Sequence, residues 1–404
     1  MLRGMAQERP AARWGVLAAA FVTLVLVQGA TFTFPVFLVP LSREFGGLRG
    51  VAALAFSLHN LVVGLVATVV DPLMGRFGER RVFAVAALVL GAGLALSGTA
   101  GSMLWLILWF SGVAGVGAGL LGSVAQTVTL SRWFPTARGT VVGLALSGMG
   151  VGMFLFAPLS AVLIERFDWR WAFVVIGIGT AGLLLPTNAL APGAPPESSA
   201  VATAATGRET RIGDVLGSLR FWCFAAAFFF TPLSNFMVTT HQVAHIVDAG
   251  IEPQWAAAAF GVMGLLSAFG RAGFGALSDR VGRVPMALLS YAATALGTVA
   301  LLLVRPGSPS WLLYVFIALF GLTLGARGPI VAALAADLYR GRTYGTVLGL
   351  ITLGNRLGSA LGPWLGGVIY DLTGSYRAAF ATSVGAIAVA AVALTAAGRL
   401  GSRD

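Results

Sequence analysis

Residues 139–144 read Gly-Thr-Val-Val-Gly-Leu, and residues 345–350 read Gly-Thr-Val-Leu-Gly-Leu. The two stretches lie 206 positions apart (345 against 139) in a chain of 404 residues, which is about half of its length. Gly148 with Gly354, and Gly152 with Gly358, keep the same offset. A repeat of this period predicts that the chain consists of two related halves.

The composition is that of a membrane protein. Hydrophobic residues make up 57% of the chain and charged residues 10%, and the mean hydropathy is +0.88, which no ordinary soluble domain reaches. Apolar stretches long enough to cross a bilayer lie near residues 14–39, 51–70, 82–101, 103–130, 139–164, 171–191, 219–247, 255–278, 284–304, 310–336, 343–370 and 377–398. We therefore predict an all-α membrane protein with twelve transmembrane helices in two pseudo-symmetric six-helix bundles.

One long hydrophilic segment separates the two predicted bundles. Residues 192–218 are rich in Pro, Ala, Ser and Thr, and we predict that they form a cytoplasmic linker between bundles at 14–191 and 219–398. The other loops are short and leave no room for a soluble catalytic domain. Duplicated bundles of this kind are typical of secondary transporters, which hold their substrate between the halves.

The net charge of +11 reflects membrane topology better than nucleic-acid binding. All 26 basic residues are arginines, and most fall on the side of the predicted helices that faces the cytoplasm if the N-terminus is inside. This predicts a multi-pass protein of the cell (inner) membrane, surrounded by the lipid bilayer, with both termini cytoplasmic and no nucleic-acid partner. No glycine-rich nucleotide-binding motif occurs, and the single cysteine, Cys223, excludes a cysteine metal cluster. We predict no nucleotide partner, no cofactor and no metal.

Three arginines lie inside apolar stretches of the second half: Arg271, Arg327 and Arg356. An arginine near the bilayer centre costs about 2.5–3.5 kcal/mol, so three cost roughly 8–10 kcal/mol if the terms add. The 15 acidic residues all lie in predicted loops or near span ends, as Asp279 and Asp371 do. An anionic ligand is the economical partner for such cations, and the planar guanidinium group suits a carboxylate.

The surroundings of these arginines differ. Arg271 shares a helical face with small residues including Ser267, and Arg356 follows Asn355 near the middle of its span. We predict that these four residues bind the substrate, although an arginine that bonds backbone carbonyls would be structural. For Arg327, which precedes Gly328-Pro329, we favour the structural role, because proline frees a carbonyl that an arginine can satisfy.

Polar residues are rare in the other spans. In the first half we predict that Gln28, His59 and Gln126 contribute to substrate binding, with hydrogen bonding between helices as the alternative. His59, His241 and His245 are candidates for proton coupling, because histidine titrates near neutral pH. The spacing of His241, His245 and Asp248 resembles a metal-ligand set, but we favour a polar cavity wall.

Residues 275–283 read Gly-Ala-Leu-Ser-Asp-Arg-Val-Gly-Arg and match the signature loop of the major facilitator superfamily, between the eighth and ninth predicted spans. A less complete copy at 71–81 lies between the second and third. The resemblance implies alternating access, with charged contacts of these loops stabilising one state. The residues that we assign to this gating motif are Asp71, Arg76, Asp279, Arg280 and Arg283.

A narrower resemblance covers most of the chain. Phe34-Pro35, Asp168-Trp169-Arg170 and Arg220-Phe221-Trp222 are similar to the monocarboxylate transporter family and its bacterial relatives, including oxalate/formate antiporters. In that family an arginine of the eighth span binds the substrate carboxylate, and Arg271 matches its position. A basic residue in the eleventh span of the oxalate carriers is similar to Arg356 in general location.

The chain also departs from the animal members of that family. Ser267 stands where proton-coupled members have an acid, and Val36 where they have a lysine. We expect a secondary active transporter of mono- or dicarboxylates and leave proton coupling and anion exchange open. Export of a neutral or drug-like compound, or a non-transporting membrane sensor, remain alternatives. We do not expect an enzyme, because no nucleophile elbow occurs.

Overall fold

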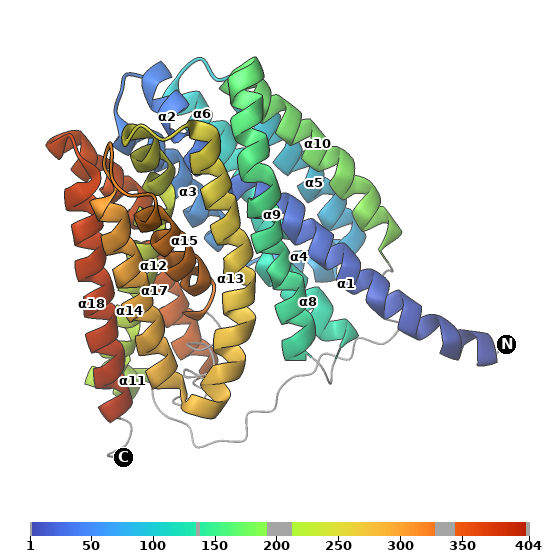
Figure 1. Ribbon diagram of the computed structural model, residues 1–404. Coiled ribbons are helices and arrows are strands. Elements are labelled where there is room, and N and C mark those ends of the chain that lie inside the picture. The colour runs from blue at the N-terminus through green and yellow to red at the C-terminus, as the bar shows by residue number, and fades with distance from the viewer. Residues whose placement is uncertain (1, 135–137, 192–211, 328–343, 401–404) are drawn as a thin grey trace. The chain divides into compact units, whose positions relative to one another are not determined.

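The computed structural model describes residues 2–134, 138–191, 212–327 and 344–400, and within these ranges all regular secondary structure is helical (Figure 1). The contacts between residues divide the chain into two compact units. The first unit comprises Met1–Gly47, Leu58–Ser199 and Glu252–Ala268, and the second comprises Leu48–Ser57, Ala200–Ile251 and Phe269–Asp404. Most of the predicted linker, at 192–211, lies outside the described residues.

The first unit contains the helices of the first half of the chain. They are α1 (Leu2–Phe32), α2 (Phe34–Glu44), the later part of α3 (Arg49–Val66), α4 (Val70–Phe77), α5 (Glu79–Ser97), α6 (Met103–Leu106), the π-helix η1 (Ile107–Ala114), α7 (Gly115–Leu121), α8 (Ser123–Trp133), α9 (Arg138–Phe167) and α10 (Trp169–Leu190), with the start of α13 (Pro253–Val281).

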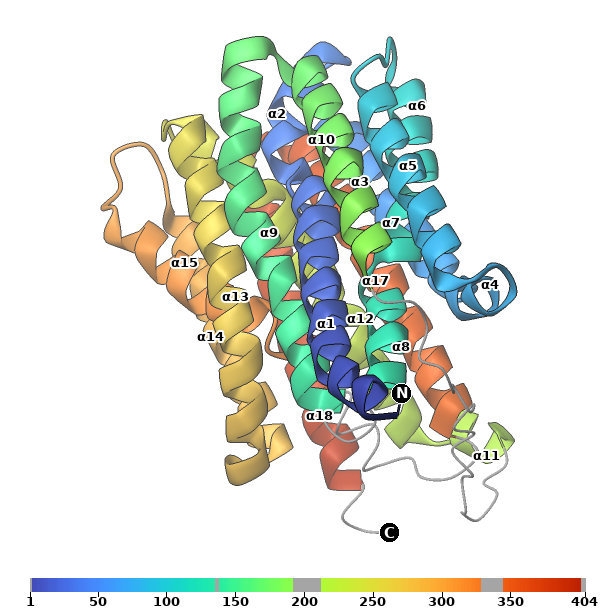
Figure 2. The ribbon, with the colours of Figure 1, turned by 90° about the vertical axis from the view of Figure 1, so that its right-hand side faces the viewer.

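Glycines let α1 and α9 pack closely in the first unit, where the two helices lie side by side (Figure 2). A Cβ atom added to Gly152 would lie 2.2 Å from the carbonyl oxygen of Val25, and one added to Gly148 would lie 2.6 Å from that of Phe21. Only glycine permits so close an approach of two backbones, and small-residue seams of this kind hold helices together in lipid, where the hydrophobic effect does not.

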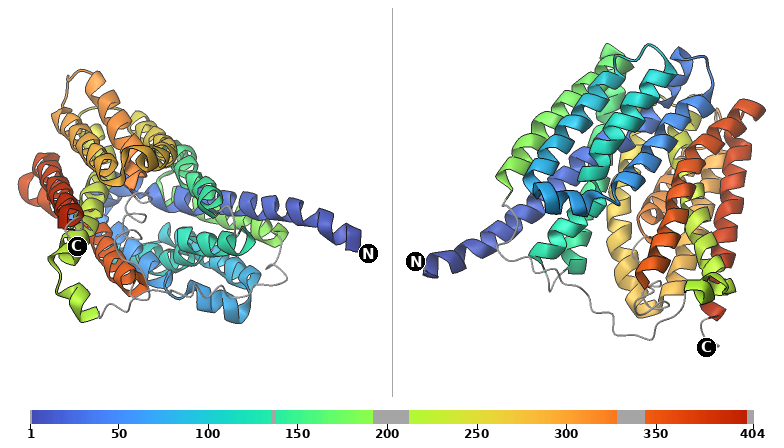
Figure 3. Two further views of the ribbon diagram at one scale, coloured as in Figure 1. Left: turned by 90° about the horizontal axis from the view of Figure 1, so that it is seen from below. Right: turned by 180° about the vertical axis from the view of Figure 1, so that it is seen from behind.

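The second unit contains the helices of the second half. They are α11 (Ile212–Leu216), α12 (Leu219–Asp248), the later part of α13, α14 (Arg283–Leu303), α15 (Trp311–Leu324), α17 (Tyr344–Thr373) and α18 (Tyr376–Leu400), together with the start of α3. Within this unit α12 packs along both α17 and α18 (Figure 3).

The sequence repeat corresponds to a repeated packing arrangement. Gly358 on α17 lies close to α12, just as Gly152 on α9 lies close to α1. A Cβ atom added to Gly358 would lie 2.2 Å from the carbonyl oxygen of Phe229. Gly362 and Gly366 continue the contact with α12. The eleventh predicted span therefore packs on the seventh as the fifth packs on the first.

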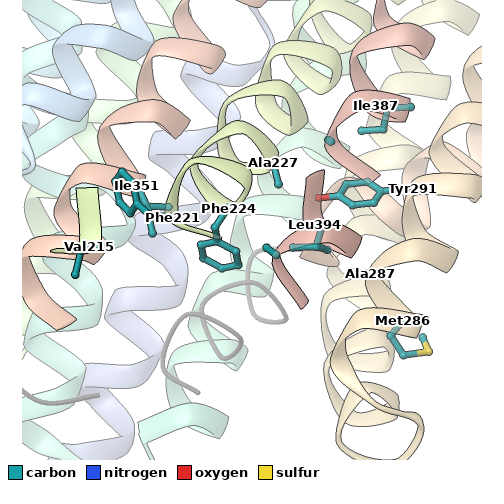
Figure 4. Packing of buried hydrophobic residues seen from close by; sticks show 12 residues of the cluster. Val215, Phe221, Phe224, Ala227, Met286, Ala287, Tyr291, Ile351, Ile387 and Leu394 are labelled. Carbon is teal, nitrogen blue, oxygen red and sulfur yellow. The ribbon is translucent and has the colours of Figure 1, made fainter. Parts of the chain in front are cut away.

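Large apolar side chains of the second unit pack together in its interior. Phe221, Phe224, Ile351 and Leu394, from three helices, belong to one buried cluster (Figure 4). Tyr291 of α14 is the member of this cluster that also carries a hydroxyl group. The cluster joins α12, α14, α17 and α18, which carry some of the polar residues considered below.

Ten of the described helical segments are long and apolar enough to cross a membrane, and they correspond to ten of the twelve predicted spans. The predicted span at 310–336 corresponds to α15, and its residues beyond Arg327 lie outside the described ranges. The predicted span at 343–370 corresponds to α17, which has 30 residues. Asn355, Arg356 and the repeated glycines lower the hydropathy of α17.

Candidate substrate-binding site

Arg271 lies on α13, one residue after a close contact between helices. Gly270 faces α15, where an added Cβ would lie 1.7 Å from the carbonyl oxygen of Leu322. Gly273 and Gly275 have no neighbouring atom within 4 Å of an added Cβ, so the helix is crowded on one face and open on another. The Arg271 side chain is half-buried. Ser267, one turn earlier and in the first unit, is buried and donates a hydrogen bond of 2.6 Å to the carbonyl of Gly264.

Arg356 and Asn355 lie on α17 and are both half-buried. The glycine face of α17 packs on α12, and Arg356 is two residues from both Gly354 and Gly358, about 200° round the helix. Its side chain therefore points away from α12. Among the described residues no acidic side chain forms an ion pair with Arg356.

Arg327 is the most deeply buried of the three predicted arginines, with 4% of its surface exposed. It donates a hydrogen bond of 2.8 Å from Nη2 to Oδ1 of Asn235 on α12. The sequence predicted a structural arginine that bonds a freed carbonyl, and the partner found in the described part of the chain is this side-chain amide. Gly328 and Pro329, on which that prediction rested, lie outside the described residues.

Two of the predicted polar residues of the first unit, His59 and Gln126, have local hydrogen-bond partners. His59 is buried, with its Nδ1 atom 2.9 Å from the carbonyl oxygen of Phe110 and its ring stacked on that phenylalanine. Gln126 is also buried and donates from Nε2 to the carbonyl of Leu121, where an extended residue, Gly122, separates α7 from α8. Gln28 is half-buried on α1.

The histidines of α12 have different partners although they share a helical face. His241 lies between the hydroxyl of Tyr376 and the carbonyl of Pro363, at 3.2 and 2.7 Å, whereas His245 Nε2 is 3.0 Å from the carbonyl oxygen of Leu301. No group of three potential metal ligands occurs within the described ranges. The third residue of the pattern, Asp248, is engaged by an arginine.

That arginine, Arg49, is the centre of a polar cluster in the second unit that the sequence analysis did not identify. Its guanidinium group pairs with both carboxylate oxygens of Asp248, at 2.5 and 2.8 Å, and lies over the ring of Tyr370 at 4.1 Å. The carboxylate of Asp371 accepts hydrogen bonds of 2.8 Å from the backbone N–H groups of Arg49 and Gly50. The first N–H groups of a helix have no acceptor within the helix itself. Asp371 of α17 satisfies two of these groups at the start of α3.

Span order is the signal that would have found this cluster. Successive spans run in opposite directions, so the start of the second span and the ends of the seventh and eleventh lie on one side of the membrane. Arg49, Asp248 and Asp371 are charged residues at those three ends.

The two copies of the signature loop turn in the same way, since Gly78 adopts φ +83° between α4 and α5 where Gly282 adopts φ +106° between α13 and α14. In the first copy Asp71 pairs with Arg132 of α8 at 2.6 Å, and Arg76 is exposed on α4. In the second copy α13 ends at Val281, Gly282 adopts φ +106°, and α14 begins at Arg283. Asp279 and Arg280 are exposed, whereas Arg283 is half-buried.

Comparison with known proteins gives one consistent assignment. The model of the family described as Major Facilitator Superfamily matches residues 19–307 and 272–400. Monocarboxylate transporter 13 of Rattus norvegicus is 30% identical over 376 residues, which cover 92% of this chain and 86% of the relative. Monocarboxylate transporter 11 of Homo sapiens is 31% identical, over 92% of this chain and 79% of the relative.

Solved structures agree on the fold. The nucleoside transporter NupG superposes with a TM-score of 0.77 at 12% identity, over 96% of this chain and 99% of that one. A bacterial homologue of the human lysosomal transporter Spinster gives a TM-score of 0.68 at 16% identity, over 97% of each chain. These relatives are transporters rather than enzymes, and the predicted fold and family are confirmed. The chain belongs to the Major Facilitator Superfamily of multi-pass membrane transporters and, within it, to the members that resemble the monocarboxylate transporters.

Proposed function

We propose that this secondary transporter moves small organic anions, either mono- or dicarboxylates, and that Arg271 is the main contact of the carboxylate. Two observations support the proposal. The chain matches proteins named monocarboxylate transporters over 92% of its length, and Arg271 is carried within a membrane-spanning helix immediately before the signature loop. A guanidinium group offers a carboxylate two parallel charge-assisted hydrogen bonds, which gives both affinity and orientation.

Arg356 is the proposed second contact, with Asn355 beside it. The position of Arg356 opposite the glycine face of α17 supports this role, because that face is occupied by α12. Two cationic contacts would favour a dicarboxylate or the exchange of anions, whereas Arg271 alone would favour a monocarboxylate. Ser267, Gln28, His59 and Gln126 stay predictions as binding residues.

The proposed cycle is alternating access between two bundles, at 14–191 and 219–398, joined by the linker 192–218. Asp71, Arg76, Asp279, Arg280 and Arg283 would stabilise one state through charged contacts on the cytoplasmic side, with both termini cytoplasmic in the cell membrane. Proton symport, anion exchange and facilitated diffusion are the three modes of transport that this cycle allows. Of the proposed proton-coupling residues, His59, His241 and His245, each lies within hydrogen-bond distance of a backbone carbonyl oxygen.

The test is uptake of a radiolabelled monocarboxylate and of a dicarboxylate by proteoliposomes. We expect Arg271→Ala to reduce the rate of uptake by about tenfold to a hundredfold, because one or two charge-assisted hydrogen bonds to the carboxylate are lost. Arg305→Ala is the matched control, since Arg305 is an exposed arginine of the same unit. Uptake by Arg271→Ala at the wild-type rate would remove this residue from the binding site.

A thermal-shift screen of the purified protein identifies the class of ligand, because a ligand that binds the folded state raises its apparent stability. Mono-, di- and aromatic carboxylates are compared at two pH values with neutral drug-like compounds. Stabilisation by carboxylates that Arg271→Ala abolishes supports the proposal. Stabilisation by neutral compounds alone would favour a drug-like cargo, and binding without uptake would favour a sensor.

A further inference from the structure

Arg327 is a buried cation whose local environment resembles a ligand-binding site. It follows the end of α15, and its guanidinium group lies over the ring of Tyr291 at 5.2 Å from the ring centroid. Tyr291 is 2% exposed and Asn235 is 8% exposed, so the groups around Arg327 are enclosed as well. A charge in such surroundings costs several kcal/mol unless it is paired and hydrogen-bonded.

The hydrogen bonds around Tyr291 fix the direction of its proton. The Thr231 hydroxyl donates to the carbonyl of Ala227 at 2.7 Å and therefore accepts from the Tyr291 hydroxyl, 2.9 Å away. Tyr291 belongs to the packed cluster of Figure 4. Its ring is thus fixed beneath the guanidinium group, and its only proton is used by Thr231.

Most N–H donors of Arg327 have no hydrogen-bond partner among the residues that the structure describes. Nη2 donates to Asn235, whereas Nε and Nη1, which carry three N–H groups between them, are buried without a hydrogen-bond partner in the described part of the chain. Asn235 accepts through Oδ1, and its Nδ2 amide group is a further donor of the same side chain. The remaining N–H groups of Arg327 and the Nδ2 group of Asn235 are all hydrogen-bond donors, and the guanidinium group also carries a positive charge. Water could satisfy the N–H groups but would leave the charge without a counter-ion.

We propose that Arg327 and Asn235 form a buried anion-binding site inside the second unit, lined on one face by Tyr291 and independent of the contact proposed for Arg271. The ligand is a small anion, either a halide or the carboxylate end of a substrate, because the enclosing residues leave little exposed surface. Both ligands offer the same chemistry to the site, a compact negative charge that accepts several N–H groups.

The experiment uses the full-length purified protein in a buffer free of halide and carboxylate. Binding of sodium bromide and of sodium formate is measured by isothermal titration calorimetry for the wild type, Arg327→Gln, Arg271→Ala and the exposed control Arg305→Gln. We expect saturable binding in the wild type and a loss of affinity of at least about tenfold in Arg327→Gln. Arg305→Gln should keep the wild-type bromide affinity, and Arg271→Ala shows how much of the bromide is bound at Arg271 instead. Displacement of bromide by formate identifies a site that a substrate carboxylate can enter, and bromide binding without displacement identifies a halide site.

Asp337→Asn tests the alternative that the chain itself supplies the anion. Asp337 is the one acidic residue of the segment 328–343, which lies outside the described residues. The proposal expects unchanged bromide affinity in this variant, whereas a gain in affinity would show that the Asp337 carboxylate occupies Arg327 and would overturn it.

A measurement on the wild type covers the case in which Arg327→Gln fails to fold. Bromide-soaked crystals should show an anomalous peak within hydrogen-bond distance of Nε or Nη1 of Arg327. Absence of this peak, or equal bromide affinity in wild type and a folded Arg327→Gln, would refute the site. The role proposed for Arg271 is judged separately by uptake, so the two proposals can fail independently.

Discussion

Replacement of Gly270 by alanine tests whether the backbone contact between α13 and α15 positions Arg271. The added Cβ would lie 1.7 Å from the carbonyl oxygen of Leu322 and 2.7 Å from its carbonyl carbon. Ordinary contacts of a Cβ begin near 3.4 Å, so the two backbones must separate by roughly 1.5–2 Å. The atoms in contact belong to the main chain, and no side-chain rotation can relieve the overlap.

The expected magnitude follows from two opposing effects. Overpacking of this kind typically costs about 1–3 kcal/mol, and the backbone overlap places Gly270→Ala at the upper end of that range. Alanine regains up to about 1 kcal/mol through its helix propensity. A net loss of about 2–3 kcal/mol of folding free energy is expected. The displacement also moves Arg271, the next residue, and a misplacement of about 1 Å can reduce the rate of a positioned reaction about a hundredfold.

Gly273→Ala is the matched control on the same helix. Its added Cβ has nothing within 4 Å, so we expect unchanged or slightly raised thermal stability and wild-type uptake. Thermal unfolding of the purified variants and carboxylate uptake per folded molecule are the two measurements. Gly270→Ala should lose both stability and uptake. Wild-type stability in Gly270→Ala, or equal losses in the two variants, would refute the reasoning from the close contact.

Two ion pairs allow a graded comparison of electrostatic contributions. In a double-mutant cycle with Arg49→Gln and Asp248→Asn, we expect a coupling energy of about 1–2 kcal/mol, because the pair is bidentate and the Arg49 side chain is only 10% exposed. The same cycle with Asp71→Asn and Arg132→Gln should give about 0.2–1 kcal/mol, since these side chains are 59% and 29% exposed. Reversible unfolding in mixed micelles measures both, and a larger coupling for the exposed pair would contradict this ranking.

The fold could be predicted from the sequence because the bilayer imposes a simple rule. A segment that crosses lipid must satisfy its backbone internally, so long apolar stretches become helices. The repeat then predicted which helices correspond, and Gly152 and Gly358 indeed make equivalent contacts in the two units. What composition could not predict is the division of the fourth span at Gly122, where the backbone is extended and Gln126 bonds a carbonyl of the preceding helix.

The candidate site was only partly predictable. Arg271 and Arg356 could be singled out because an arginine within an apolar stretch is rare and costly. Arg49 was missed because a charged residue at the end of a span is ordinary, and its significance depends on partners about 200 and 320 positions away. Predicting such a cluster requires knowing which span ends lie on the same side of the membrane. Hydropathy alone does not give this information, whereas the order of the spans does.

The arginines of the second unit differ in how many hydrogen bonds and counter-ions the described residues provide for their guanidinium groups. Arg49 is paired with a carboxylate and covered by Tyr370, so its charge is used in holding the start of α3. Arg327 receives one amide oxygen and an aromatic face, which satisfy a single N–H group and leave the charge without a counter-ion in the described part of the chain. Within the described ranges no acidic side chain forms an ion pair with Arg327 or Arg356, so no described residue supplies a counter-ion for either guanidinium group. A membrane protein that carries anions is the kind of protein for which such an imbalance is useful, because a fixed internal carboxylate would compete with every anionic ligand.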